Sequence, residues 1–316
     1  MVKLFLFICC IFRPLSLLKC SSKILVIFIT VVCFNIKGQY ADIINKKRLR
    51  TVIITESSFY LAGNAFLQYV WYRNHDRTKF HFYNDNKGYL QMDKCGHSFS
   101  AYQYSRKGYE ALRWAGVNKK KSLIFGGPLG LVLQTPIEVF DGLYKGYGFS
   151  KGDMIANAAG SAIFSIQQAL WDDQIVKMKF SYAPSIYNKY NTYGLGATPL
   201  ESFFLDYNGH TYWLSGNIKS ITSHKKVPSW LNVAVGYSAK GMLSEFKNYE
   251  YYNYKLVPRF YRYRQWFFSL DIDLSKIKTK NKLLKTILNQ INSLKIPFPA
   301  LEYNRIDKLN FRPFYY

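Results

Sequence analysis

The chain contains 316 residues, of which 49% are apolar and 20% are charged, and its formal net charge at pH 7 is +24. The apolar fraction excludes a disordered chain and provides enough side chains for hydrophobic cores. The positive charge favours anionic partners, such as a membrane surface or phosphate-bearing envelope lipids. Nucleic acid is not an expected partner, because the basic residues are dispersed and no zinc-finger, RRM or helix-turn-helix signature accompanies them.

The first 38 residues have the pattern of a segment that directs export. The apolar run ILVIFITVVCF follows the basic residues Lys3, Arg13, Lys19 and Lys23 and precedes a polar stretch. A run of about eleven residues suits the core of a signal peptide better than a membrane span of about 20. We therefore expect residues 1–38 to be a signal peptide cleaved near Gly38. The alternative is an uncleaved N-terminal anchor, because the earlier letters LFLFICCIF lengthen the apolar stretch.

The cysteines agree with export and loss of this segment. Only Cys95 lies outside it, since the others are Cys9, Cys10, Cys20 and Cys33. The mature chain could then form no intramolecular disulfide, and its stability must come from packing. Lipidation of Cys33 stays open, although Val32 stands where a lipobox has a small residue.

Residues 39–175 are expected to form a bundle of about four helices. Their segments cover residues 51–72, 93–114, 121–144 and 151–171. The third contains Gly127, Pro128 and Pro136 and should be kinked or split, and the fourth is rich in small residues that permit close helix packing. Polar residues recur inside every segment, so we expect membrane association rather than a multi-pass protein.

Residues 176–316 show period-two alternation with turn residues between the alternating stretches. Strands are predicted within residues 175–184, 230–239 and 264–274, and a further helix within residues 278–294. The final letters NFRPFYY are similar to the end of an outer-membrane barrel, but the strands are fewer than the required eight or so. We expect an α+β fold in which an irregular β-rich region with one further helix lies against the bundle.

Three polar pairs on the helical segments are the candidates for chemistry. Their members are Asp93 with His97, Glu138 with Asp141, and Asp153 with Asn157. Residues three or four apart share one face of a helix, and unpaired burial would cost several kcal/mol. The pairs should therefore meet one another or reach water. If they converge, the carboxylates, imidazole and amide could form a hard-metal or acid–base site, with His97 pointing toward the acids.

Each pair also has a structural interpretation. Asp93 could be the N-cap of its helix, and Lys94 in the first turn could extend to water. Ser150 is the expected N-cap of the fourth helix, with Asp153 in the capping-box position. Glu138 and Asp141 lie at a helix C-terminus, where acids oppose the dipole, and are the least explained by structure.

The motifs DKCGHSFSAYQYS, EVFDG and FSKGDMIANAAGS, in this order, resemble the YfiM-like family of predicted periplasmic lipoproteins of unknown function, in its Bacteroidetes-type long form. A second similarity, to VanZ-like membrane proteins, rests on the same order of residues. The family pattern corresponds to Asp93, Lys94, Gly96, His97, Glu138, Asp141, Gly142, Ser150, Asp153, Asn157 and Gly160. The resemblance implies a periplasmic, membrane-associated location in the cell envelope but no reaction. This sequence departs from the family in one respect, because the residues before Cys33 match a lipobox poorly.

Two functions of different classes follow. The first is a non-enzymatic, membrane-associated helical scaffold in the envelope. The second is a metal-dependent or His/carboxylate-dependent hydrolase or transferase acting on a phosphorylated lipid or cell-wall precursor. In the second, His97 would be the acid–base group, and Asp93, Glu138, Asp141 and Asp153 would be metal ligands or orienting groups beside Asn157. No nucleophile elbow, P-loop, HExxH or CxxC motif supports an enzyme, and the sequence identifies no cofactor, metal or oligomeric state.

Overall fold

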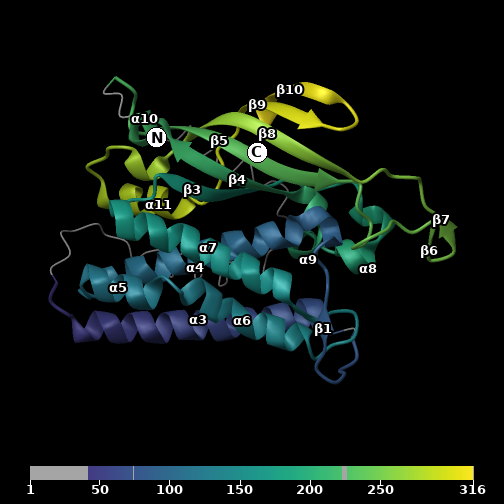
Figure 1. Cartoon of the computed structure of the whole chain (residues 1–316), viewed down its shortest axis with the longest axis horizontal. Coiled ribbons are helices and arrows are strands. Elements are labelled where there is room, and N and C mark those ends of the chain that lie inside the picture. Colours follow the sequence, from purple (N-terminus) through teal and green to yellow (C-terminus); the bar gives the residue numbers. More distant parts are fainter. Residues whose placement is uncertain (1–41, 74, 223–225, 316) are drawn as a thin grey trace.

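The structure is a computed structural model that describes residues 42–73, 75–222 and 226–315. A helical layer lies along one side of a twisted antiparallel sheet (Figure 1). This mixture of helices and a separate antiparallel sheet confirms the α+β class. The predicted signal peptide or anchor of residues 1–38 lies outside the described residues.

The helical layer is built around α4. Its described helices are α3 (Lys46–Tyr72), α4 (Met92–Trp114), α5 (Lys119–Gly126), α6 (Leu129–Asp141) and α7 (Lys151–Trp171). α4 packs against α5, α6 and α7, whereas α3 has few contacts with α4 and buries only Val52, Val70 and Tyr72. The expected compact bundle of about four helices is therefore not what these residues form.

The third apolar segment is split, as its glycines and proline predict. α5 ends at Gly126 and α6 begins at Leu129, with Gly127 and Pro128 between them. Among the described residues, one helical segment, Lys119–Asp141, is long and apolar enough to cross a membrane, by length and composition only.

Two glycines allow the helices to approach α4 closely. A Cβ atom at Gly130 in α6 would lie 2.0 Å from the carbonyl oxygen of Ala101, and one at Gly160 in α7 would lie 2.0 Å from that of Ser98. Because no side chain fits into these spaces, the two helix backbones rest almost directly on α4.

The β-rich region is a regular sheet, which corrects the expectation of an irregular one. Its spatial order is β10-β9-β8-β5-β4-β3, and every pairing is antiparallel. The strands are β3 (Val176–Tyr182), β4 (His210–Asn217), β5 (Leu231–Lys240), β8 (Tyr263–Ile272), β9 (Phe298–Asn304) and β10 (Lys308–Tyr315). Phe180 in β3 also exchanges backbone hydrogen bonds with Ser293 and Lys295, which precede β9.

The remaining elements are short, apart from one amphipathic helix. α11 (Lys282–Ile291) is the predicted further helix. It is not the sole one, because α8 (Thr192–Leu195), α9 (Pro199–Leu205) and α10 (Ile218–Thr222) are also present. The short strands are β1 (Phe82–Tyr83), β2 (Phe149–Ser150), β6 (Tyr251–Tyr252) and β7 (Lys255–Leu256), and the 3₁₀ turns are η1 (Gly88–Gln91), η2 (Asn188–Tyr190), η3 (Tyr207–Gly209) and η4 (Leu274–Lys276).

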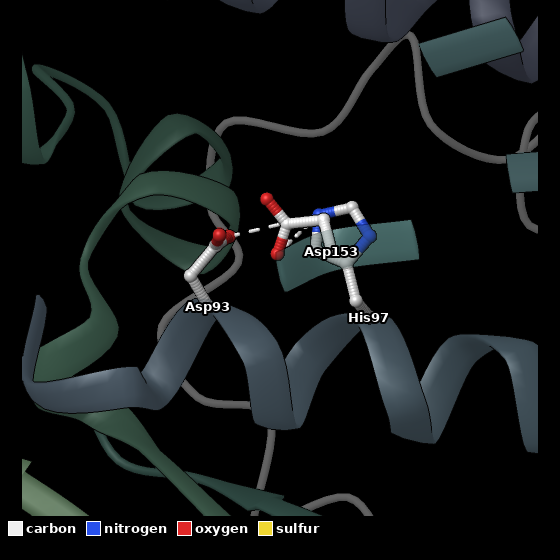
Figure 2. A group of neighbouring side chains, drawn as sticks. All are labelled: Asp93, His97 and Asp153. Carbon is white, nitrogen blue, oxygen red and sulfur yellow. Dashed lines mark ion pairs between the residues drawn. The ribbon is translucent and has the colours of Figure 1, made fainter. Parts of the chain in front are cut away.

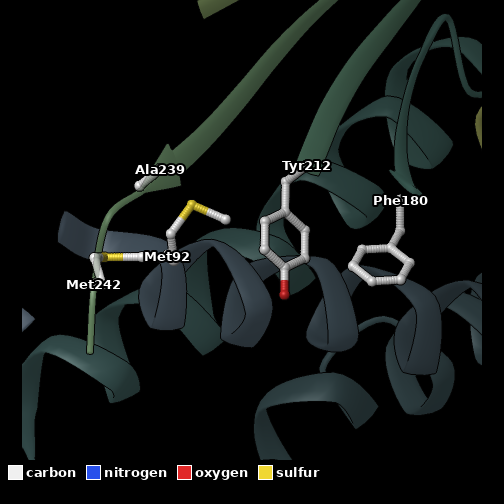
Figure 3. Packing of buried hydrophobic residues seen from close by; sticks show 5 residues of the cluster. All are labelled: Met92, Phe180, Tyr212, Ala239 and Met242. Atoms are coloured by element: carbon white, nitrogen blue, oxygen red, sulfur yellow. The ribbon is translucent and has the colours of Figure 1, made fainter. Parts of the chain in front are cut away.

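Hydrophobic clusters join the helical layer to the sheet. In one of them, Met92 from α4 meets Phe180 from β3 and Tyr212 from β4, together with Ala239 and Met242 (Figure 3). A second cluster joins α4 and α7 to Met178 of β3. The predicted division at residue 175 stays a prediction, and these cores cross it. The packing of α4 on the sheet fixes the start of α4, where the polar motif lies.

Candidate functional site

The start of α4 has an unusual backbone. Three consecutive residues before the helix, Tyr89, Leu90 and Gln91, have positive φ angles of 42°, 52° and 66°. Gln91, not Asp93, is the N-cap, and its side chain forms no capping hydrogen bond to the helix, so the proposed capping role of Asp93 is wrong. Asp93 lies in the first turn of the helix, and its carboxylate is therefore available to other partners.

His97 points toward Asp93 and Asp153 (Figure 2), and it also forms an ion pair with Glu138 on α6. Its Nε2 atom lies 3.5 Å from Glu138 Oε1, 3.8 Å from Asp93 Oδ1 and 3.9 Å from Asp153 Oδ1. Its Nδ1 atom lies 3.1 Å from Asn157 Oδ1. The structure thus brings together both members of two predicted pairs, Asp93 with His97 and Asp153 with Asn157. From the third pair it adds Glu138.

Asp141 lies at the edge of this group and is the predicted acid that forms no ion pair with His97 among the described residues. Its Oδ1 atom accepts a hydrogen bond from the hydroxyl of Tyr72 in α3. Asp141 therefore links α6 to α3 and contributes only its charge to the nearby imidazole.

Lys94 is part of the site, which corrects the expectation that it extends to water. Its side chain is only 15% exposed, and its Nζ atom lies 2.7 Å from Asp85 Oδ2, 2.8 Å from Asp153 Oδ1 and 3.3 Å from Asp93 Oδ2. The ammonium group is held by three carboxylates, because these acids would otherwise be buried next to one another without a counter-charge.

Ser150 forms the start of α7 as predicted. Its Oγ atom accepts a hydrogen bond from the backbone N–H of Asp153 (3.1 Å) and donates one to Asp85 Oδ1 (2.6 Å). Its own N–H donates to Glu138 Oε2 (3.3 Å). Because the serine satisfies the helix end, the Asp153 carboxylate is directed to Lys94 and His97 instead.

Sequence reasoning missed Asp85, Tyr72 and Tyr207, which complete the surroundings. Tyr207 donates a 2.5 Å hydrogen bond to Asp93 Oδ1 from a turn 114 residues away in the chain. These residues come from loops or from a distant helix, where no helical spacing links them to the motif. We call the group Asp85, Asp93, Lys94, His97, Glu138, Asp141, Asp153 and Asn157 the helical site.

Burial and mutual charge shift the pKa values in the helical site. Burial raises the pKa of Glu138 to about 8 and that of Asp141 to about 7, and burial together with the charge of Asp93 raises that of Asp153 to about 7. Burial alone would lower the pKa of His97, but the carboxylates of Asp93, Asp153 and Glu138 raise it to about 9. The acids and the imidazole compete for protons within one buried cluster.

One group of atoms has the spacing of metal ligands. Asp93, His97 and Asp153 each offer one ligand atom, and the three atoms lie within 4.8 Å of one another. Ligands about 2.1 Å from a shared ion are themselves about 3 to 4 Å apart. Nearby, Glu138 Oε1 accepts no hydrogen bond and Asn157 Nδ2 donates none among the described residues, although both side chains are fully buried.

A second histidine, His210, is buried outside the helical site. It is only 5% exposed, and its ring nitrogens contact the hydroxyl of Tyr212 and the carbonyl oxygen of Phe203. Burial lowers its pKa to about 4. His210 is therefore a neutral core residue next to the sheet.

Comparison with known proteins gives one match. The model of a family described as "Predicted periplasmic lipoprotein (DUF2279)" matches residues 81–169, which hold every residue of the helical site. No curated protein and no solved structure is significantly similar to the chain. The match supports similarity to a periplasmic lipoprotein-like family. It confirms neither the narrower YfiM-like name nor the similarity to VanZ-like proteins.

The localisation expected from the sequence agrees with this description. The protein is a periplasmic, membrane-associated protein of the cell envelope. The description names no reaction, and the matched residues cover α4, α5, α6 and most of α7. The region of similarity therefore coincides with the helical site and leaves the sheet outside it.

Proposed function

We propose that this chain is a non-catalytic scaffold of the cell envelope that associates with an anionic membrane surface and holds a divalent cation in its helical site. Asp93 and His97 from α4 and Asp153 from α7 would be the ligands, and Glu138 from α6 is the adjacent acid. The cation would join α4 to α7 and would lie next to α6.

The observation that carries the proposal is the imbalance of charge in the helical site. It contains five acids but only Lys94 and His97 as basic groups. Buried carboxylates repel one another strongly unless cations or protons neutralise them. A divalent cation would provide the missing positive charge, and Glu138 Oε1 provides an acceptor with no hydrogen bond of its own.

The orientation of His97 also supports metal binding. When Nδ1–H donates to Asn157 Oδ1, the lone pair of Nε2 faces the carboxylates of Asp93 and Asp153. Metal-binding histidines are commonly fixed by such a hydrogen bond from the other ring nitrogen. A donor set of carboxylates and one imidazole suits Mn²⁺, Fe²⁺ or Zn²⁺ better than Mg²⁺.

Burial favours a structural role for the ion over a catalytic one. The side chains of Glu138 and Asp153 are 0% and 4% exposed, and those of His97 and Asp93 are 14% and 22% exposed. A substrate needs room at the metal, whereas an ion that joins helices needs only its ligands.

Metal titration of the purified full chain tests the proposal. After chelator treatment and dialysis, calorimetry with Mn²⁺ or Zn²⁺ should show one site per chain, and bound metal should raise the melting temperature. Asp93→Asn and Asp153→Asn should each abolish this binding. Asp76→Asn is the matched control, because Asp76 is exposed and pairs only with Lys145.

Absence of binding by the wild-type chain would contradict the proposal. The helical site would then be a network neutralised by Lys94, protonated His97 and protonated acids. Equal binding by the wild-type chain and both aspartate variants would place the ion elsewhere and would also contradict it.

A second candidate is a metal-dependent hydrolase or transferase that acts on a phosphorylated lipid or cell-wall precursor. It is favoured by the partial exposure of Asp93 and His97, which form the accessible side of the helical site. In this case His97 would be the acid–base group. Metal-dependent phosphate release from a phosphorylated lipid, lost in His97→Gln, would support this candidate over the scaffold.

A further inference from the structure

The sheet has the reverse of the usual polarity. Antiparallel sheets of soluble proteins place apolar side chains inward and polar ones outward. Along β8, the buried positions include Gln265, Ser269 and Asp271, whereas Trp266 and Phe268 are 50% and 53% exposed. Apart from Arg264, the exposed side chains on this strand are hydrophobic, and Phe267 is the one apolar side chain among its buried positions.

The outward side chains form rows across neighbouring strands. Leu214, Val235, Phe268, Leu301 and Phe311 are consecutive partners in the register from β4 to β10. Each of them is between 44% and 63% exposed. The row thus makes a continuous apolar strip across five strands.

A second row, of aromatic side chains, runs beside the first. Tyr237 pairs with Trp266, and Trp266 pairs with Tyr303. The rings of Tyr237 and Trp266 are in contact, with centroids 4.8 Å apart. We call the two rows together the outer sheet face.

The outer sheet face continues a surface that the molecule already uses for packing. Tyr212 is the partner of Tyr237 in the register, and it packs with Phe180 against Met92 of α4. The helical layer covers this face at Phe180 of β3 and Tyr212 of β4, and Figure 1 shows β9 and β10 on the side of the sheet farthest from the helices. The same apolar face is left uncovered where the helices end.

The arrangement of residue types indicates what covers it. Membrane-facing strands combine outward apolar residues with a belt of tyrosine and tryptophan at the level of the headgroups. The cations Arg264, Arg305 and Lys308 lie one or two residues beyond the aromatic row. Positive charge at this level is complementary to anionic phospholipid headgroups.

We propose that the outer sheet face docks on an anionic phospholipid bilayer, with the apolar row among the acyl chains and the aromatic row at the headgroups. The inference rests on the membrane association in the proposed function and names the surface responsible for it. It is independent of metal binding in the helical site.

Photo-crosslinking to lipids tests this surface in the full chain. The protein is mixed with vesicles of phosphatidylethanolamine and phosphatidylglycerol that contain a tracer phospholipid with a diazirine in its acyl chain. Illumination followed by peptide mass spectrometry identifies the labelled residues. We expect label in the peptides of β5, β8 and β9, and its loss from these peptides in the Phe268→Gln/Leu301→Gln double variant.

The helical layer supplies the matched control. Ile155 and Leu170 in α7 are 70% and 66% exposed, and Ile155→Gln/Leu170→Gln should leave the label in the sheet unchanged. If wild-type label occurs only in the helices or in residues 1–41, membrane association survives but the outer sheet face is not its surface. If label occurs nowhere, the outer sheet face and the membrane association in the proposed function both fail, whereas metal binding in the helical site is unaffected.

A second copy of the chain is the competing occupant. Light scattering at several protein concentrations distinguishes it, because the Phe268→Gln/Leu301→Gln variant would then convert a dimer to a monomer. That result, with no label in the sheet peptides of the wild-type chain, would overturn the proposal. The wild-type crosslinking pattern stays informative even if the double variant fails to fold.

Discussion

The molecule contains two buried networks of charge that are neutralised in different ways. Behind the sheet, Lys179 lies 2.7 Å from Asp271, and Lys177 pairs with Asp273, while Lys295 lies 3.9 Å from Asp271. Lysines therefore outnumber aspartates in this group. In the helical site, acids outnumber basic groups. Among the described residues, buried polar atoms without a hydrogen bond occur in both networks: Glu138 Oε1, Asp153 Oδ1 and Asn157 Nδ2 in the helical site, and Asp271 Oδ1 behind the sheet.

The pKa values of Asp273 in the sheet network and Glu138 in the helical site are shifted in opposite directions. Burial would raise the pKa of Asp273, but the charge of Lys177 lowers it to about 2. Burial raises the pKa of Glu138 to about 8. The positive charge of His97 opposes this shift, but the nearby acids Asp153 and Asp141 add to it. Lysines already outnumber the aspartates behind the sheet, whereas the excess of acids in the helical site supports the proposal that it holds another cation.

Breaking the sheet network should have the largest effect. Asp271→Asn leaves the fully buried Lys179 without its counter-charge, and we expect a loss of about 3 to 5 kcal/mol of unfolding free energy. Urea unfolding at neutral pH measures the change. Asp76→Asn at the surface should change the free energy by less than about 1 kcal/mol, and an equally small change for Asp271→Asn would contradict the assignment.

Two histidines extend the comparison. The pKa of His97 in the helical site is raised, whereas that of the buried His210 is lowered to about 4. A histidine whose folded pKa lies below its unfolded value of about 6.5 contributes stability above that value. This contribution is lost as the pH falls from about 6.5 toward 4. We expect His210 to account for a loss of about 3 kcal/mol.

Urea unfolding of the wild-type chain and of His210→Gln at pH 7 and pH 4 isolates this effect. The wild-type chain should lose more stability than the variant over that interval, because glutamine does not titrate. Equal losses would mean that His210 is charged, or is exposed, in the folded protein.

Removing the imidazole of the helical site should have an intermediate effect. His97→Ala leaves Glu138 and Asp153 with less positive charge, and we expect a loss of about 1 to 3 kcal/mol in metal-free protein. Thermal unfolding of chelator-treated samples measures it. A stability equal to that of the wild-type chain would show that the acids are neutralised without His97.

Glu138→Gln should have the smallest effect on metal-free stability, within about 1 kcal/mol, because the glutamine oxygen can still accept from Ser150 N–H. Removing one acid from an acid-rich site also reduces repulsion. The stabilisation by added Mn²⁺ or Zn²⁺ should nevertheless decrease. Melting temperatures with and without metal test both expectations, and a large metal-free loss would show that Glu138 belongs to a balanced network.

Helical spacing was enough to predict the centre of the site. Asp93 and His97 lie one turn apart, as do Asp153 and Asn157, and the cost of burying such pairs alone predicts that they meet. The direction of Lys94 could not be predicted, because it depends on Asp85 in a loop. The contact of Tyr207 with Asp93 could not be predicted either, because it depends on the packing of α4 on the sheet.

The sheet shows a different limit of the sequence. Alternation identifies strands, but a period of two is the same whichever face is buried. The stretch RQWFFSLDIDL thus predicts β8, yet it does not reveal that Trp266 and Phe268 point outward while Asp271 is enclosed. The regular order of the sheet depends on pairings between distant strands, which the separate stretches do not specify.

The close contacts at Gly130 and Gly160 determine which amino-acid substitutions the protein tolerates at these positions. Alanine at either glycine would push α6 or α7 away from α4, since the new methyl group would meet a backbone carbonyl at 2.0 Å. Asp153 and Asn157 are carried by the same helix as Gly160. A lineage could therefore keep every charged residue of the helical site and still lose its geometry through one neutral-looking substitution.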